Sequence, residues 1–294
     1  MMKKPCLVMI LALAVFPGCQ QDSAPTTTLK ARASYTPYGS GEELPLRWAD
    51  AQLVHGLTLK ISNTVAPDLD YGDGNNGYVD GANEWNTGLP GKTFFALPFV
   101  TVANRQKSQL VSYFDDEMGI YKAQTWFAEV GSGALAITQF FGVRRTNSSG
   151  QYIELQHADI ILNYHDYAFS SDADDFTKYD LPSVILHEMG HFIGLRHEYS
   201  TYESVMRPSL GSYESERQIY PADLTKLEHN YDVPHVETLT AAAGPNVRAA
   251  GISSSQEPEM IQGRFELRAN GRCVHFINGK VVGEHEAVIS NLFH

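Results

Sequence analysis

Residues 187–197 read His187-Glu-Met-Gly-His191-Phe-Ile-Gly194-Leu-Arg-His197, which sets three histidines, one glutamate and one glycine at the spacing HExxHxxGxxH. Two histidines four residues apart lie on the same face of an α-helix, so both can reach one metal ion. Gly194 favours the left-handed conformation that ends a helix and turns the chain back toward His197. The spacing therefore predicts three histidine ligands around one Zn²⁺, with the fourth position left for water.

The glutamate of this stretch, Glu188, is the candidate general base. Zinc lowers the pKa of its bound water to ~7, and a neighbouring carboxylate can take the proton and pass it to a leaving amine. A bare HExxH pattern has an alternative explanation, a core helix whose histidines are only buried and hydrogen-bonded. The further match at Gly194 and His197 favours the catalytic zinc site.

The residues that follow resemble those of the metzincin metalloproteases. Ser204-Val205-Met206-Arg207-Pro208 is similar to the Met-turn of that family, in which Met206 would form an apolar floor beneath the metal. The alternative is an ordinary buried methionine in a loop. Eight residues separate His197 from Met206, which resembles the short connection of the matrixin branch. This resemblance implies a zinc endopeptidase with His187, His191 and His197 as ligands and Glu188 as the base.

The chain departs from the family pattern at two places. Matrixins continue Pro-x-Tyr to form a wall of the S1′ pocket, whereas this chain has Pro208-Ser209-Leu210. Glu198 directly follows the third histidine, as in astacins, but Pro208 stands where astacins and serralysins carry a metal-binding tyrosine. The resemblance therefore leaves the S1′ specificity and the subfamily open.

The expected fold is α/β (α+β), a metzincin-type catalytic domain over residues 44–232 with a twisted mixed sheet. Residues 57–62 alternate as a strand, and Val79, Ala82 and Trp85 follow at helical spacing before Gly88. The active-site helix is expected to begin near Asp180, a good N-cap, and a closing helix at Pro221. Residues 158–162 resemble the matrixin strand that edges the substrate cleft, so we expect a peptide to pair with this strand.

Further metal sites have weaker support in the sequence. The segment between Asp159 and His187 is too short for the matrixin loop that carries a structural zinc and calcium ions. Asp73-Gly-Asn75-Asn-Gly77 is followed by Tyr78 where a calcium loop needs glycine, which indicates a turn and helix entry. A cluster of histidines and aspartates lies between residues 157 and 175. Such a cluster is more typical of a solvated loop than of a metal site, and Ca²⁺ binding stays an open alternative. This cluster contains His157, Asp159, His165, Asp166, Asp172, Asp174 and Asp175.

The N-terminal segment has the pattern of an export signal. Lys3 and Lys4 precede a short apolar run, and residues 1–18 are predicted to be a cleaved signal peptide. Gly18-Cys19 resembles a bacterial lipobox, which implies lipidation of Cys19, a flexible tether over residues 19–43 and an anchor in the outer membrane or at the cell surface. The alternative is a plain secreted protein.

The remaining sequence bounds the partners and the C-terminal part. Cys273 has no partner once Cys6 is removed and Cys19 is lipidated, so no intramolecular disulfide is expected. A net charge of −12 argues against a nucleic-acid partner. Residues 233–262 have linker composition, and residues 263–294 are predicted to form a small β-meander because Asn270-Gly271 and Asn278-Gly279 are hairpin turns. So short a tail is expected to pack on the protease.

These features together predict a monomeric zinc-dependent endopeptidase that acts on extracellular or surface proteins. A protein or peptide would be its substrate, and the lipid on Cys19 would attach it to the membrane. The alternative from a different class is a surface-anchored binding lipoprotein whose zinc site is structural or inactive.

Overall fold

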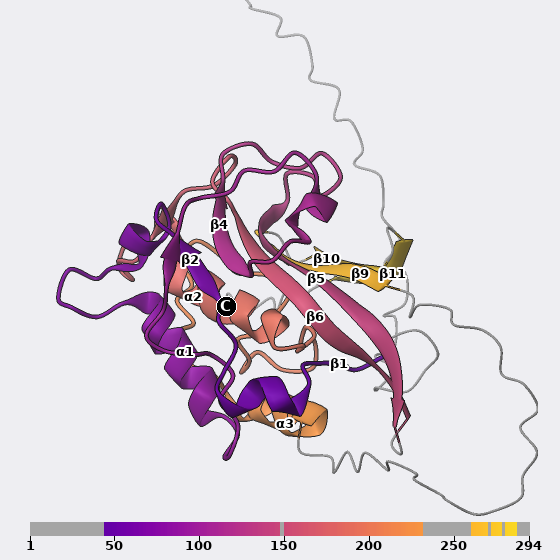
Figure 1. Cartoon of the computed structure of the whole chain (residues 1–294). Helices are drawn as coiled ribbons and strands as arrows, with labels where there is room; N and C mark the ends of the chain where they lie inside the picture. The colour runs from indigo at the N-terminus through magenta and orange to yellow at the C-terminus, as the bar shows by residue number, and fades with distance from the viewer. Residues whose placement is uncertain (1–43, 148–149, 232–259, 270–271, 278–279, 287–294) are drawn as a thin grey trace, which may run out of the picture. The chain divides into compact units, whose positions relative to one another are not determined.

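The computed structural model describes residues 44–147, 150–231, 260–269, 272–277 and 280–286 (Figure 1). The strands are β1 (Leu46–Arg47), β2 (Lys60–Ser62), β3 (Thr101–Val102), β4 (Gly119–Ala123), β5 (Ala134–Asn147), β6 (Gly150–Asn163), β7 (Phe169–Ser170), β8 (Tyr179–Asp180), β9 (Met260–Arg268), β10 (Arg272–Ile277) and β11 (Lys280–Glu286). The α-helices are α1 (Gly77–Thr87), α2 (Leu181–Phe192) and α3 (Pro221–Tyr231). The 3₁₀ helices are η1 (Asp50–Val54), η2 (Ala66–Leu69) and η3 (Leu110–Tyr113).

The main sheet is mixed, as predicted. Its order is β11-β10-β9-β5-β6-β4-β2-β3, and β1 pairs with the first half of β6. Strands β3, β2, β4 and β6 run parallel to one another, whereas β5 is antiparallel to β6 and β9 is antiparallel to β5. The C-terminal meander therefore continues the sheet of the catalytic domain from the β5 side.

The sequence-based assignment of residues 158–162 to the strand that edges the cleft is wrong. These residues belong to β6, which is hydrogen-bonded to β4 on one side and to β5 on the other. Their apolar side chains alternate between two cores: Ile160 and Leu162 join the core that contains the helices, and Ile161 joins a smaller one on the other face. A strand buried on both faces reads as a continuous apolar run, and such a run does not reveal whether the strand is internal. In the sheet order, β5 lies between β6 and β9, so residues 158–162 are separated from the C-terminal strands by β5.

Helix α2 is buried along its whole length between α1 and the sheet. Asp180 caps its first turn by accepting a hydrogen bond from the Ser183 N–H, at 3.0 Å. The indole N–H of Trp85 in α1 donates to the Leu186 carbonyl at 3.0 Å, which fixes the two helices side by side. Figure 1 shows these helices next to each other. The three helices predicted from the sequence are thus confirmed. They are the helix that contains Val79 and Trp85, the helix that begins after Asp180 and the helix that begins at Pro221.

Other expectations meet the structure in part. Only the end of the strand expected at residues 57–62 forms β2, while Leu57 makes an isolated bridge to Phe95. The meander forms as predicted, although its first strand begins at Met260 and not at residue 263. The predicted signal peptide, the tether and most of the linker lie outside the described residues. None of the described helices is long and apolar enough to cross a bilayer.

Candidate metal centre

Three buried imidazoles converge near the C-terminal end of α2. Nε2 of His197 lies 3.2 Å from Nε2 of His187 and 2.9 Å from Nε2 of His191. A tetrahedral Zn²⁺ bound at ~2.05 Å holds its ligand nitrogens ~3.3 Å apart, so the observed donor set fits this ion. Within the described part of the chain, no other cluster of three His, Cys, Asp or Glu side chains comes this close together.

Backbone carbonyls set the tautomers of two of these histidines. Nδ1 of His187 lies 2.6 Å from the Val205 oxygen, and Nδ1 of His191 lies 2.8 Å from the Leu195 oxygen. A carbonyl only accepts, so each Nδ1 carries the proton and each Nε2 presents a lone pair toward the others. Burial lowers the pKa of His187 to about 4, which keeps it in the neutral form that binds a metal.

Glu188 lies beside the first ligand with its carboxylate fully buried. Its Oε2 accepts a 2.5 Å hydrogen bond from the hydroxyl of Thr138 in β5, while its buried Oε1 has no hydrogen-bond partner among the described residues. Burial raises the pKa of Glu188 to about 8, against the opposing effects of Thr138 and of the Leu267 backbone N–H. A carboxyl group with a pKa near neutrality is suited to accept and then donate a proton.

Gly194 makes the turn that the sequence predicts between the second and third histidines. Its φ is +91°, and a Cβ at this position would lie 2.2 Å from the Leu46 carbonyl oxygen. Both the backbone conformation and the close approach of β1 therefore require glycine.

The carbonyls at the end of α2 receive donors from two distant segments, which satisfies groups that a helix leaves unpaired. The Trp48 indole donates to Phe192 at 2.7 Å, the Tyr231 hydroxyl to Ile193 at 2.6 Å and the Asn230 amide to Gly194 at 3.1 Å. The segment after β1 and helix α3 thus hold the path of the chain toward His197.

The loop around Met206 is anchored beneath the histidines by Asp223 of α3. This carboxylate accepts hydrogen bonds from the Ser204 hydroxyl, from the Val205 N–H at 3.0 Å and from the Tyr220 N–H at 2.9 Å. Met206 is fully buried, and its sulfur would lie 2.3 Å from a Cβ built on Gly190. Glycine at position 190 therefore lets the methionine pack directly against the ligand helix.

A comparison with protein families agrees with this geometry. The matrixin family model matches residues 99–232, which include β5, α2, the Met206 loop and α3. Residues 99–232 are therefore similar to the matrixin family. A search of curated proteins found no match. The matrixin domain and its three converging histidines together support a zinc metallopeptidase.

The structure brings together His187, Glu188, His191, His197 and Met206 in the matrixin domain. It does not support a calcium site in the polar cluster expected before α2. His157 and Asp159 instead form a buried pair at 2.7 Å, and Asp159 also accepts the Gly119 N–H at 2.8 Å. Cys19 lies outside the described residues.

Sequence reasoning missed several groups that support the site. The carbonyls of Val205 and Leu195 could not be found, because every residue carries a carbonyl. Thr138 also had no local signal, since its role depends on the pairing of β5 with the rest of the sheet. Asp223 stands in the first turn of the predicted closing helix, where an acidic residue would be assigned to the helix dipole.

Proposed function

We propose that this protein is a zinc-dependent endopeptidase that hydrolyses peptide bonds in extracellular or cell-surface proteins. The observation that carries the proposal is the convergence of three buried Nε2 atoms, together with the buried carboxylate of Glu188, the residue that follows His187. Three neutral histidines that leave one position open are typical of catalytic zinc sites, whereas structural sites are closed by four protein ligands.

The residues divide the chemistry as follows. His187, His191 and His197 would hold Zn²⁺, which when bound polarises the scissile carbonyl and lowers the pKa of water. Glu188 would accept a proton from the attacking water and donate it to the leaving amine. Thr138 orients Glu188 by its 2.5 Å hydrogen bond and leaves the other carboxylate oxygen free for this proton transfer. Met206 would support the ligands from below.

The proposal is tested by substituting Glu188→Gln, which removes the base and leaves all three ligands. We expect the zinc-loaded variant to keep its metal and to lose nearly all of the cleavage of casein, an unstructured substrate, that the same chain with Glu188 shows. Glu203→Gln is the matched control, because Glu203 is exposed and should leave the cleavage rate unchanged. A chelator should abolish cleavage, and added zinc should restore it.

A chelator-resistant activity, or full activity of Glu188→Gln, would reject the proposed mechanism. Tight zinc binding without cleavage of any unstructured substrate, by the wild type or by any variant of the chain, would leave the alternative of a binding lipoprotein with a structural or inactive zinc site.

The proposed location rests on the N-terminal sequence. Export to the bacterial outer membrane or cell surface, with a lipid on Cys19, would place the enzyme close to surface proteins. Mass spectrometry of membrane-extracted protein should show an acylated Cys19 as the mature N-terminus. An unmodified N-terminus at another residue would contradict the anchor and favour simple secretion of a monomeric enzyme.

A further inference from the structure

Strand β9 lies between the two backbone segments that flank the proposed catalytic residues. On one side it pairs antiparallel with β5, with Leu267 opposite Ala136 and Gly263 opposite Phe140. On the other side Arg268 donates to the Pro208 carbonyl and accepts from the Leu210 N–H, both at 3.1 Å. An extended peptide that adds a strand to a sheet edge is bound in this way, through its backbone.

The side chains of β9 reach the metal centre. The Phe265 ring stacks on the His191 ring, with centroids 4.4 Å apart and an interplanar angle of 11°. Leu267 is buried, and together with His187, Val205 and Leu210 it lines a small pocket of about 10 Å³. That volume holds at most one water molecule, so no substrate side chain fits beside Leu267 there. The backbone N–H of Leu267 also faces the Glu188 carboxylate.

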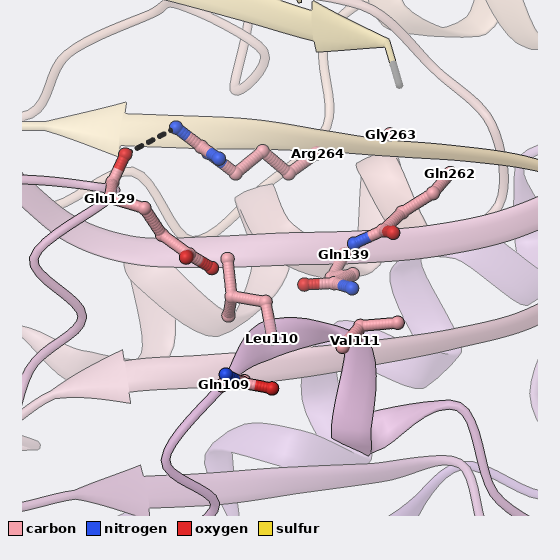
Figure 2. Close-up of a pocket in the computed structure, with 8 residues that line it drawn as sticks. All are labelled: Gln109, Leu110, Val111, Glu129, Gln139, Gln262, Gly263 and Arg264. Carbon is pink, nitrogen blue, oxygen red and sulfur yellow. Dashed lines mark hydrogen bonds between the residues drawn. The ribbon is translucent and has the colours of Figure 1, made fainter. Parts of the chain in front are cut away.

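On the opposite face of β9, the charged side chains form ion pairs within the strand. Glu266 is fully buried and pairs with Arg264 at 2.9 Å and with Arg268. Figure 2 shows Arg264 beside this strand, where it donates to the Glu129 carbonyl at 2.9 Å. A buried carboxylate is costly unless it is paired, and here the strand supplies both partners itself.

Gly263 permits the close approach of β9 to β5. A Cβ on this residue would lie 2.2 Å from Cζ of Phe140, and Phe140 in turn stacks on Phe265 with centroids 5.5 Å apart. Any larger residue at position 263 therefore forces the Phe140 ring or β9 itself to move. This substitution touches neither the three histidines nor Glu188, so it tests the seating of β9 without replacing a proposed catalytic group.

We propose that β9 is an intramolecular ligand of the substrate cleft and holds the peptidase latent until the strand is displaced. This inference rests on the proposed function, since it assigns the cleft to peptide binding. A substrate and β9 cannot occupy the β5 edge and the Leu267 pocket together. Because β9 is part of the same chain, its effective concentration at the cleft is high. A substrate can bind only to the fraction of molecules in which the strand has left the cleft.

The test compares zinc-loaded full chains in a casein cleavage assay. Gly263→Val should raise the rate by at least about tenfold, because a larger fraction of molecules has an open cleft. Leu267→Asp, which places a charge at a buried apolar position of β9, should do the same by an independent change. Met260→Ala is the matched control, since Met260 is an exposed residue of the same strand and should leave the rate unchanged.

Two further measurements report on the strand itself. Hydrogen exchange should show protected β9 amides in the wild type and faster exchange at β9 in Gly263→Val. A synthetic peptide of residues 260–269 should inhibit Gly263→Val, whereas the same peptide with valine at position 263 should not.

Equal cleavage rates for the wild type and both displaced variants would overturn latency and leave the peptidase proposal intact. Absence of cleavage by all of the zinc-loaded chains, with β9 shown by exchange to be displaced, would instead overturn the peptidase proposal and latency with it. Slow exchange at β9 in Gly263→Val, together with an unchanged rate, would show that Gly263 does not control the strand and would also reject the inference.

Discussion

Replacing Asp223 by asparagine tests how firmly α3 holds the loop beneath the metal centre. Asp223 is fully buried, and its two oxygens accept three hydrogen bonds from Ser204, Val205 and Tyr220. Asparagine has nearly the same shape but is neutral and keeps one acceptor oxygen. The NH₂ group of the new asparagine must face one of the present donors, so at least one hydrogen bond is lost. The hydrogen bonds that remain are weaker because their acceptor is no longer charged.

The magnitude follows from the number of bonds. A hydrogen bond to a charged group contributes ~1.5–3 kcal/mol and a neutral one ~0.5–1.5 kcal/mol, a difference of ~1 kcal/mol for each bond. Three bonds give an expected loss of about 3 kcal/mol in the free energy of unfolding. Zinc affinity should also fall by ~10-fold or more, because the carbonyl of Val205 orients His187 at 2.6 Å.

Urea denaturation of the zinc-free chain at neutral pH measures the first quantity, and competition with a chromogenic chelator measures the second. Asp70→Asn is the control, since Asp70 accepts the Gly72 N–H at 2.8 Å in an exposed turn. The control should stay within ~0.5 kcal/mol of the wild type. A loss below ~1 kcal/mol for Asp223→Asn would refute the assigned role of these three bonds.

Two further predictions concern the turn and the charges beside the third histidine. Gly194→Ala should destabilise the chain by ~2 kcal/mol more than Gly91→Ala in urea denaturation: both residues have positive φ, but only Gly194 has a backbone oxygen 2.2 Å from the new Cβ. Equal losses in the two variants would show that the contact with Leu46 relaxes freely. Burial opposes the charge of Glu198, yet Ser200 and Lys226 outweigh it and lower its pKa. The stabilisation from Glu198 is therefore present above the pKa of the unfolded carboxyl and is lost as the pH falls through the lowered folded pKa. Glu198→Gln should thus be less stable than the wild type near pH 7, and the difference should shrink near pH 3; a constant difference at both pH values would contradict this linkage.

Local signals in the sequence were sufficient for the metal centre. The histidine spacing, the N-cap at Asp180 and the glycine at position 194 each act over a few residues, and the structure contains the helix and the turn that they predict. The two Asn-Gly pairs predicted the meander for the same reason, because a hairpin is decided by its turn.

Pairing between distant strands was not accessible in this way. The mostly apolar segment at residues 158–162 is compatible with an edge or an internal strand, and only the position of β5 decides between them. The place of β9 depends on a shape match between Gly263 and Phe140, which are far apart in the chain. Neither residue has an unusual sequence context, so the occupied cleft became visible only in three dimensions.

The pairing of β9 with β5 also bears on solubility. When β9 leaves, part of β5 presents a row of free N–H and C=O groups, and such an edge recruits strands from other molecules and promotes aggregation. The open form of the enzyme is therefore expected to aggregate more readily than the closed form. A substrate that takes the place of β9 covers that edge again, so turnover itself would protect the active form from self-association.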